Sequence, residues 1–491
     1  MRRTSGIGWT VGLAILSGTA PATSAGAQPG SLRSEPFTLR AYDGRERPAE
    51  HVRLTVPADD RSDRTIDLAF VRLRPTGTAT RPPVVFLMGG PGVPASVMAP
   101  IPPYFTLFTR LADGGDVILL DQRGLGDSSP KSDCPAATAP LPADLFDTPE
   151  ALLAAFAANY RACATALAPR VRATDYTVER VAGDVQAIRV ALGVPQVDLL
   201  AFSFGSRIAL DVIARHPERI RKVVLQGVLG VDTLRLPSLD DAVFRRFSAI
   251  GDAQAAAKGL VPGAAEAVRT IQARAARTPL SVAVKTVAGE ARQLRLGPGT
   301  FTAVILAHLG DPNMQAVLTA AVGEDYALLT PWLQSLYQDL EKGAGSLMAR
   351  AMLCSVASPP ATRRQAAREA ATTLLGEALD NRMQDGAFCQ AVGVTPPASQ
   401  TAVKARVPAL LISGTLDPRT PPDRTEVTRR GLAGSEHVIV ENGGHELLPV
   451  PEVQDLVVSF LDGKPDRKPI ALPSPEVRTI EEARRPPRPR R

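Results

Sequence analysis

The stretch that most constrains the fold is residues 197–206, where an apolar run ends at a serine and a helical pattern begins. Ser203 has small residues two positions away on either side, Ala201 and Gly205. A serine at a sharp strand-to-helix turn needs such neighbours because the backbone there is strained. The turn would lift the hydroxyl out of a sheet and aim the N–H of Phe204, at a helix N-terminus, at the oxygen that becomes negative when a carbonyl is attacked. The pattern is common by itself, so the hypothesis of a nucleophile at Ser203 depends on its context.

Apolar runs on both sides of this turn predict parallel strands. The runs at 84–87, 117–120 and 222–225 are short and largely apolar, as expected of strands that are buried on both faces of a sheet. Helical spacing at 177–192 precedes the serine strand. Strand, helix and strand in this order imply right-handed crossovers, and residues 36–75 add antiparallel edge strands. We therefore predict an α/β fold with a doubly wound, mostly parallel sheet.

The length of the chain and a change in its composition and hydrophobic pattern predict an insertion in this sheet domain. A chain of 491 residues is long for one domain. Residues 233–400 are rich in alanine and in helical spacing, and strand-like runs resume at 409–413 and 437–440. We expect a core formed by residues 28–232 and 401–463, with a helical cap at 233–400.

The two ends of the chain are expected to lie outside this fold. Residues 1–27 combine Arg2 and Arg3 with a short apolar stretch and a small-residue cleavage site, Ala25-Gly26-Ala27, which is typical of a signal peptide. This predicts an exported protein, periplasmic or secreted, with no stable membrane insertion after cleavage. Residues 464–491 are basic and rich in proline, and they predict a disordered tail.

The charge of the body between these ends gives no reason to expect a nucleic-acid partner. The whole chain carries a formal charge of +6, but residues 28–463 hold 45 Lys and Arg against 46 Asp and Glu. A nearly neutral body without a basic face is unlike a nucleic-acid-binding protein.

Four cysteines in an exported chain indicate two disulfides. Proximity in sequence favours the pairs Cys134–Cys163 and Cys354–Cys389, each of which closes a loop of about thirty residues. No CxxC and no pair of histidines at ligand spacing accompanies them, so neither a metal site nor another cofactor is expected.

Two titratable residues follow the resumed strands. Asp417 comes after the first and His445 after the second. Loops at the carboxyl ends of parallel strands converge on one edge, so both residues are expected to meet Ser203 there. His445 would act as the general base, and Asp417 would hold its tautomer. Taken singly, the serine could be a helix cap, the aspartate a turn residue and the Gly-Gly-His a tight loop.

A glycine-rich turn after the run at 84–87 completes this expected site. Its glycines allow the backbone to approach a substrate, so we expect the N–H of Gly90 to form an oxyanion hole with the N–H of Phe204. A plain strand-ending turn is the alternative interpretation. Arg123, after the next apolar run, is expected to be a structural ion-pair partner.

Five motifs together resemble the α/β-hydrolase family of proline iminopeptidases and secreted tripeptidyl aminopeptidases. They are Gly89-Gly90-Pro91-Gly92, Asp121-Gln122-Arg123-Gly124, Phe202-Ser203-Phe204-Gly205, Asp417-Pro418-Arg419-Thr420-Pro421 and Gly443-Gly444-His445. The resemblance spans about residues 50–462 and implies a serine peptidase that removes short units from peptide N-termini under a helical cap. The paired cysteines are similar to those of the secreted branch.

The chain also departs from this family. The elbow has Ala201 and Phe204 where the family usually has glycine and tyrosine, and Gln226 replaces an aspartate that is common after the next strand. The segment after Cys354 lacks the family's acidic residues. An aminopeptidase needs carboxylates for the substrate ammonium. The candidates here are Asp240, Asp241, Glu324 and Asp325.

Two other functions remain open at this stage. A carboxylesterase could use the same three residues on small esters, and a binding module could retain the scaffold without catalysis. The expected partner is a peptide or a small ester. The sequence does not determine the oligomeric state.

Overall fold

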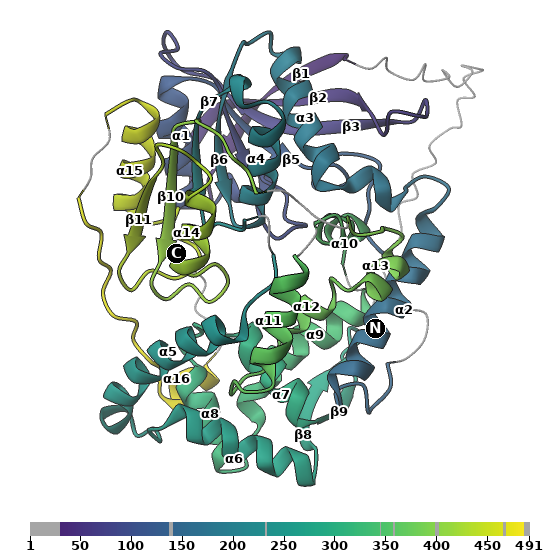
Figure 1. The fold of residues 1–491 in the computed structure, drawn as a ribbon, viewed down its shortest axis with the longest axis vertical. Helices are drawn as coiled ribbons and strands as arrows, with labels where there is room; N and C mark the ends of the chain where they lie inside the picture. Colours follow the sequence, from purple (N-terminus) through teal and green to yellow (C-terminus); the bar gives the residue numbers. More distant parts are fainter. Residues whose placement is uncertain are drawn as a thin grey trace, which may run out of the picture.

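The computed structural model describes residues 30–136, 141–230, 233–343, 345–356, 359–397, 402–464 and 468–485 (Figure 1). The predicted signal peptide at 1–27 lies outside these residues. Within the described ranges, no helix is both long enough and apolar enough to span a membrane.

A nine-stranded sheet with the order β1-β2-β3-β5-β4-β6-β7-β10-β11 forms the core. Pairing is antiparallel from β1 to β3 and between β3 and β5, and it is parallel from β5 to β11. The prediction of a mostly parallel sheet with antiparallel edge strands is confirmed. The strands are β1 (Leu32–Arg40), β2 (Glu46–Pro57), β3 (Thr65–Leu73), β4 (Val84–Leu87), β5 (Val117–Asp121), β6 (Val197–Phe202), β7 (Ile220–Gln226), β10 (Ala409–Gly414) and β11 (Glu436–Val440).

Helices cover both faces of the sheet, and successive side chains of the central strands point to opposite faces. One hydrophobic cluster joins Leu199 and Ala201 of β6 to α3 (Val178–Ala191) and α4 (Phe204–Arg215). The other joins Leu200 of the same strand to α1 (Pro102–Gly114) and α15 (Pro451–Leu461). Burial on both faces explains why these strands are largely apolar in sequence.

The cap follows β7 and lies below the carboxyl ends of the strands in Figure 1. Its helices are α5 (Pro237–Lys258), α6 (Ala264–Arg277), α7 (Pro298–Ala307), α8 (Met314–Val322), α9 (Thr330–Glu341), α10 (Leu347–Cys354), α11 (Pro360–Ala370), α12 (Leu379–Arg382) and α13 (Gly386–Val392). One helix from before the elbow, α2 (Pro149–Leu167), also packs on α10 and α13. The cap therefore includes a segment that the sequence assigned to the core.

The cap is not helical throughout. An antiparallel hairpin of β8 (Leu280–Lys285) and β9 (Ala291–Leu296) lies between α6 and α7. In β8 the apolar residues Leu280, Val282 and Val284 are buried and alternate with exposed ones. This period of two is the signature of a strand with one buried face.

The predicted disordered tail at 464–491 is wrong for residues 468–485. Ala471 forms a parallel β-bridge with Glu441, and α16 (Ile480–Arg484) begins at a capping box of Thr479 and Glu482. Ile470 and Val477 are buried, so the segment does contain apolar anchors that hold it to the body. Figure 1 shows it running from the sheet domain down to the cap.

Candidate active site

Ser203 lies on the sharp turn between β6 and α4. Its backbone has φ 53° and ψ −124°, a strained combination for a residue with a side chain. A Cβ on Gly205 would overlap the carbonyl group of Leu87, and a Cβ on Gly89 would lie 2.6 Å from Cβ of Ser203. Glycine is therefore required at both positions, and the expected elbow geometry is present.

The loops after β10 and β11 bring the two other predicted residues to this turn. His445 Nε2 lies 2.9 Å from Ser203 Oγ, and His445 Nδ1 lies 2.9 Å from Asp417 Oδ2. The three residues come from positions that are up to 242 apart in sequence. Their side chains form a continuous chain of hydrogen-bonding groups from a buried carboxylate to the serine hydroxyl.

Asp417 is fully buried and accepts several hydrogen bonds besides that of His445. Its Oδ1 accepts the N–H groups of Arg419 at 2.8 Å and Thr420 at 2.9 Å, and the Thr420 hydroxyl donates to Oδ2. Burial alone would raise the pKa of this carboxyl, but the charge and hydrogen bond of His445 and the bonds from Thr420 hold the pKa below its ordinary value. Asp417 is thus kept ionised beside the imidazole.

Gln226, at the end of β7, supports the histidine loop. Its main-chain oxygen accepts the N–H of Ser203 at 2.8 Å, and its side-chain Nε2 donates to the main-chain oxygen of His445 at 2.8 Å. Its Oε1 accepts the N–H of Leu447 at 3.3 Å. The sequence marked Gln226 only as a departure from the family. Its position after a buried strand that neighbours β6 was the signal that could have shown its role.

The glycine-rich turn after β4 faces the same space. Gly90, with φ +113°, lines one cavity together with Ser203 and Phe204. The cavity has a volume of about 390 Å³ and lies between the sheet edge and the cap. Only 9% of Ser203 is exposed, and this residue lines the cavity.

A second cavity of about 470 Å³ adjoins the first. Both cavities are lined by the same four charged residues, Arg235, Arg350, Asp380 and Arg419. The remainder of the second cavity is largely apolar, with Phe156 and Trp332 in its wall. These four residues come from separate segments without a common spacing, so no sequence pattern predicted their meeting.

None of the four acidic candidates lines either cavity. Asp240 binds the Arg235 guanidinium at 2.8 Å, and Asp241 accepts the N–H of Leu374 at 2.9 Å. Glu324 and Asp325 pair with Arg274 and Arg484. The expectation that one of these carboxylates faces the nucleophile is wrong, because each satisfies a structural contact elsewhere. Asp380 lines the cavity instead.

The remaining predicted residues have structural partners. Arg123 binds the buried carboxylate of Asp184 at 2.6 Å and donates to three main-chain oxygens, as expected of a structural ion pair. Among the described residues, no group of three or more His, Cys, Asp or Glu is placed to hold a metal ion.

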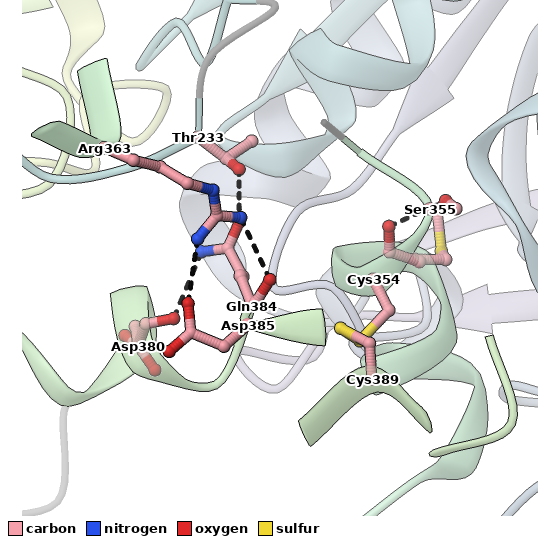
Figure 2. The surroundings of a disulfide bond; sticks show 9 residues. Thr233, Cys354, Ser355, Arg363, Asp380, Gln384, Asp385 and Cys389 are labelled. Atoms are coloured by element: carbon pink, nitrogen blue, oxygen red, sulfur yellow. Dashed lines mark hydrogen bonds and ion pairs between the residues drawn. A yellow bond between two sulfur atoms is a disulfide. The ribbon is translucent and has the colours of Figure 1, made fainter. Parts of the chain in front are cut away.

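The cysteines pair as predicted, Cys134 with Cys163 and Cys354 with Cys389. The second disulfide joins α10, which carries Arg350, to α13, which follows Asp380. Figure 2 shows this bond together with Asp380, which belongs to α12, and Gln384, which precedes α13. The disulfide therefore connects two walls of the cavity.

Comparison with known families agrees with the motifs. Residues 82–278 match a family model described as alpha/beta hydrolase fold, and residues 372–468 match one described as TAP-like protein. These matches confirm the resemblance that the motifs indicated.

Curated relatives match over part of their length only. A protein of Escherichia coli (strain K12) named as the hydrolase YuaR is 30% identical over 194 residues, which are 37% of this chain and 36% of that protein. A 2-hydroxymuconate semialdehyde hydrolase of Pseudomonas putida is 51% identical over 41 residues, 8% of this chain and 15% of that enzyme.

Solved structures cover more of the chain at low identity. A proline iminopeptidase of Mycobacterium smegmatis is 15% identical with a TM-score of 0.39, over 84% of this chain and 98% of that one. A thermophilic esterase of Thermogutta terrifontis is 16% identical with a TM-score of 0.36, over 84% of this chain and 99% of that one.

Proposed function

We propose that this chain, which has the α/β-hydrolase fold, is an exported serine hydrolase that forms an acyl-enzyme on Ser203. The observation that carries the proposal is the chain of contacts from Asp417 through His445 to Ser203, which lines a cavity of about 390 Å³. Two disulfides support an oxidising compartment.

The reaction follows from these contacts. His445 Nε2 takes the hydroxyl proton as Ser203 Oγ attacks the substrate carbonyl, and Asp417 stabilises the imidazolium that forms. The imidazolium then gives its proton to the leaving group, which departs as the acyl-enzyme forms. A water molecule then attacks the acyl-enzyme, with His445 again as the base. The imidazolium returns the proton to Ser203 Oγ, and the acid product is released.

The oxyanion is held by main-chain donors in this account. The N–H of Phe204 stands at the N-terminus of α4, next to the nucleophile. The N–H of Gly90 is the second donor, because Gly90 lines the cavity beside Ser203 and Phe204. Donors that are fixed before the reaction stabilise the developing charge without reorganisation.

An aminopeptidase that releases short units from peptide N-termini is the first candidate for the specific activity. The match to the TAP-like family model supports it, and so does Asp380, which is the acidic residue in the lining of the Ser203 cavity. A substrate ammonium in an enclosed site needs such a partner, because an unpaired cation there is costly. The cap would limit the length of the unit released.

A carboxylesterase that acts on small esters is the second candidate. The observation that favours it is that arginines outnumber carboxylates in the lining of the Ser203 cavity. An ester substrate needs no partner for an ammonium, and the apolar wall of the second cavity would hold an alkyl chain.

A matched set of chromogenic substrates separates the two candidates. Tripeptide p-nitroanilides with free and with acetylated N-termini are compared with p-nitrophenyl esters by kcat/KM. The aminopeptidase proposal predicts a preference for the free amine that Asp380→Asn removes, while Glu324→Gln, outside the cavity, retains it. Equal cleavage of blocked peptides, or cleavage of esters alone, would leave the esterase as the function.

A further inference from the structure

The charged residues that the two cavities share do not balance one another. Arg235 is compensated by Asp240 at 2.8 Å, a residue that lines neither cavity. The Asp380 carboxylate interacts electrostatically with Arg350 and contributes to the raised pKa of that arginine. Arg419 is exposed at the cavities, and no described residue forms a hydrogen bond or an ion pair with its guanidinium. One positive charge is therefore left over where the cavities meet.

The three guanidiniums converge from different parts of the fold. Arg235 donates to the main-chain oxygen of Pro418 at 3.2 Å, which places it against the loop that carries Arg419. Arg350 donates to the Tyr160 hydroxyl at 3.1 Å and lies over the Tyr160 ring. Burial opposes the charge of Arg350, but the Tyr160 oxygen and the Asp380 carboxylate raise its pKa above the ordinary value. All three arginines line both cavities.

Arg419 also reaches into the second cavity. Burial lowers the pKa of His308 in its wall, and the positive charge of Arg419 lowers it further. The one carboxylate that the second cavity adds, Asp339, does not line the Ser203 cavity. The charge of Arg419 is thus uncompensated on the side of the nucleophile.

We propose that the acyl portion of the substrate carries a carboxylate, and that Arg419, flanked by Arg235 and Arg350, binds it. This rests on the proposed reaction at Ser203. The long remainder of a peptide has to extend into solvent, so the two cavities receive the short unit that becomes the acyl group. A guanidinium offers paired donors that match a carboxylate, and an excess of such donors selects against a neutral isostere.

For a peptide, the proposal means an acidic side chain in the released N-terminal unit. Asp380 would take the ammonium of that unit, and Arg419 would take its carboxylate. The same cluster would select a dicarboxylic half-ester over a neutral ester if the enzyme acts on esters. The inference therefore holds for either candidate activity.

The test compares acidic substrates with neutral partners of similar size. Tripeptide p-nitroanilides carry Glu or Gln at each of the three positions in turn, and p-nitrophenyl hydrogen glutarate is paired with p-nitrophenyl pentanoate. At one position at least, or for the ester pair, kcat/KM should favour the acid by about 10- to 100-fold, as expected for a hydrogen bond between charged groups. Equal or better cleavage of every neutral partner would overturn the proposal.

Variants of Arg419 test whether this residue causes the preference for acidic substrates. Arg419→Gln should remove it mainly through KM, with a smaller effect on the neutral substrates than on the acidic ones, while Arg419→Lys should restore part of it. Arg430→Gln is the control, because this exposed arginine lines neither cavity. An equal loss on both members of each pair in Arg419→Gln would contradict the assignment.

A measurement on the unaltered protein covers the case in which the variant does not fold. Glutarate should inhibit turnover of a neutral substrate at least about tenfold more strongly than glutaramide, for the same reason. Equal inhibition would count against the proposal. Turnover without any charge preference would refute this inference alone, whereas absence of turnover on all substrates would refute the proposed function.

Discussion

The side-chain amide of Gln226 donates a hydrogen bond of 2.8 Å to the main-chain oxygen of His445, and the same residue accepts the N–H of Ser203 through its main-chain oxygen. One residue of β7 thus holds both the proposed nucleophile and the proposed base. Ser203 and His445 lie on two loops that are far apart in sequence. The distance between Ser203 Oγ and His445 Nε2 therefore depends on how these two loops are held together. Gln226 is therefore a positioning residue in this account.

Replacing Gln226 by leucine tests that role. Gln226→Leu leaves the His445 carbonyl and the Leu447 N–H without their partner, which should destabilise the fold by about 1–3 kcal/mol. It should also lower kcat, with KM little changed, because the imidazole loses its orientation while the cavity walls remain. Steady-state kinetics and urea unfolding measure the two effects.

Gln315→Leu is the matched control. Gln315 is also a buried amide, and its Nε2 donates to the main-chain oxygen of Val261 at 2.6 Å, within the cap. We expect a similar loss of stability and no comparable loss of kcat. If the two variants lose kcat to the same degree, Gln226 has only a structural role.

Asp417→Asn should reduce kcat by about 10⁴-fold, because an amide no longer holds the required tautomer of the imidazole. The pH dependence of the free energy of unfolding tests the ionised state of Asp417 independently. The folded-state pKa of Asp417 lies below its ordinary value of about 3.9, so the carboxylate stabilises the fold above about pH 4, and this contribution is lost as the pH falls through the lowered pKa. The difference in unfolding free energy between the two proteins should therefore shrink at acid pH.

Thr420→Val sharpens this pH experiment. The variant removes the hydroxyl that donates to Asp417 Oδ2, which should raise the pKa of Asp417 and move the loss of stability to higher pH. Urea unfolding between pH 3 and pH 7 measures the shift. A difference between the original protein and Asp417→Asn that does not change with pH would show that Asp417 is not held ionised as described.

The two disulfides should be recovered by peptide mapping without reduction, as Cys134–Cys163 and Cys354–Cys389. Removing the second pair with Cys354→Ser and Cys389→Ser should cost about 3–4 kcal/mol in the chain-entropy model. Because this bond connects α10 to α13, on the walls of the cavity, we expect KM to rise as well. Free thiols or crossed pairs would contradict the structure.

The parts of the site that follow local signals could be predicted from the sequence. Ser203, Asp417 and His445 each follow a strand-like apolar run within five residues, and parallel pairing forces such ends to one edge. The elbow at Ser203 could be predicted because the glycine that it requires stands at position 205, where a side chain would overlap the Leu87 carbonyl. The mostly parallel pairing of the strands could be predicted from the same apolar runs.

Other parts have no local signal. Arg235, Arg350, Asp380 and Arg419 meet only because the cap folds back over the sheet, and no spacing relates them. The acidic candidates failed for the same reason, since composition does not tell which carboxylate already has a structural partner. The strand β8 was missed because its alternation covers six residues within a helical, alanine-rich region.

The C-terminal segment shows a limit of composition as a guide. Its charge and prolines are those of a disordered tail, yet Ile470 and Val477 are buried against the body. A few apolar residues at the right separation are enough to anchor a segment whose overall composition is polar.

The central claim is that the hydroxyl of Ser203 is the nucleophile, activated by His445. Incubation with a fluorophosphonate, followed by intact-mass and peptide analysis, tests it most directly. We expect one adduct per chain, located on Ser203, with no adduct in Ser203→Ala and a turnover lower by about 10⁶-fold in that folded variant. Turnover in Ser203→Ala above a tenth of the original, or an adduct on another residue, would contradict the account.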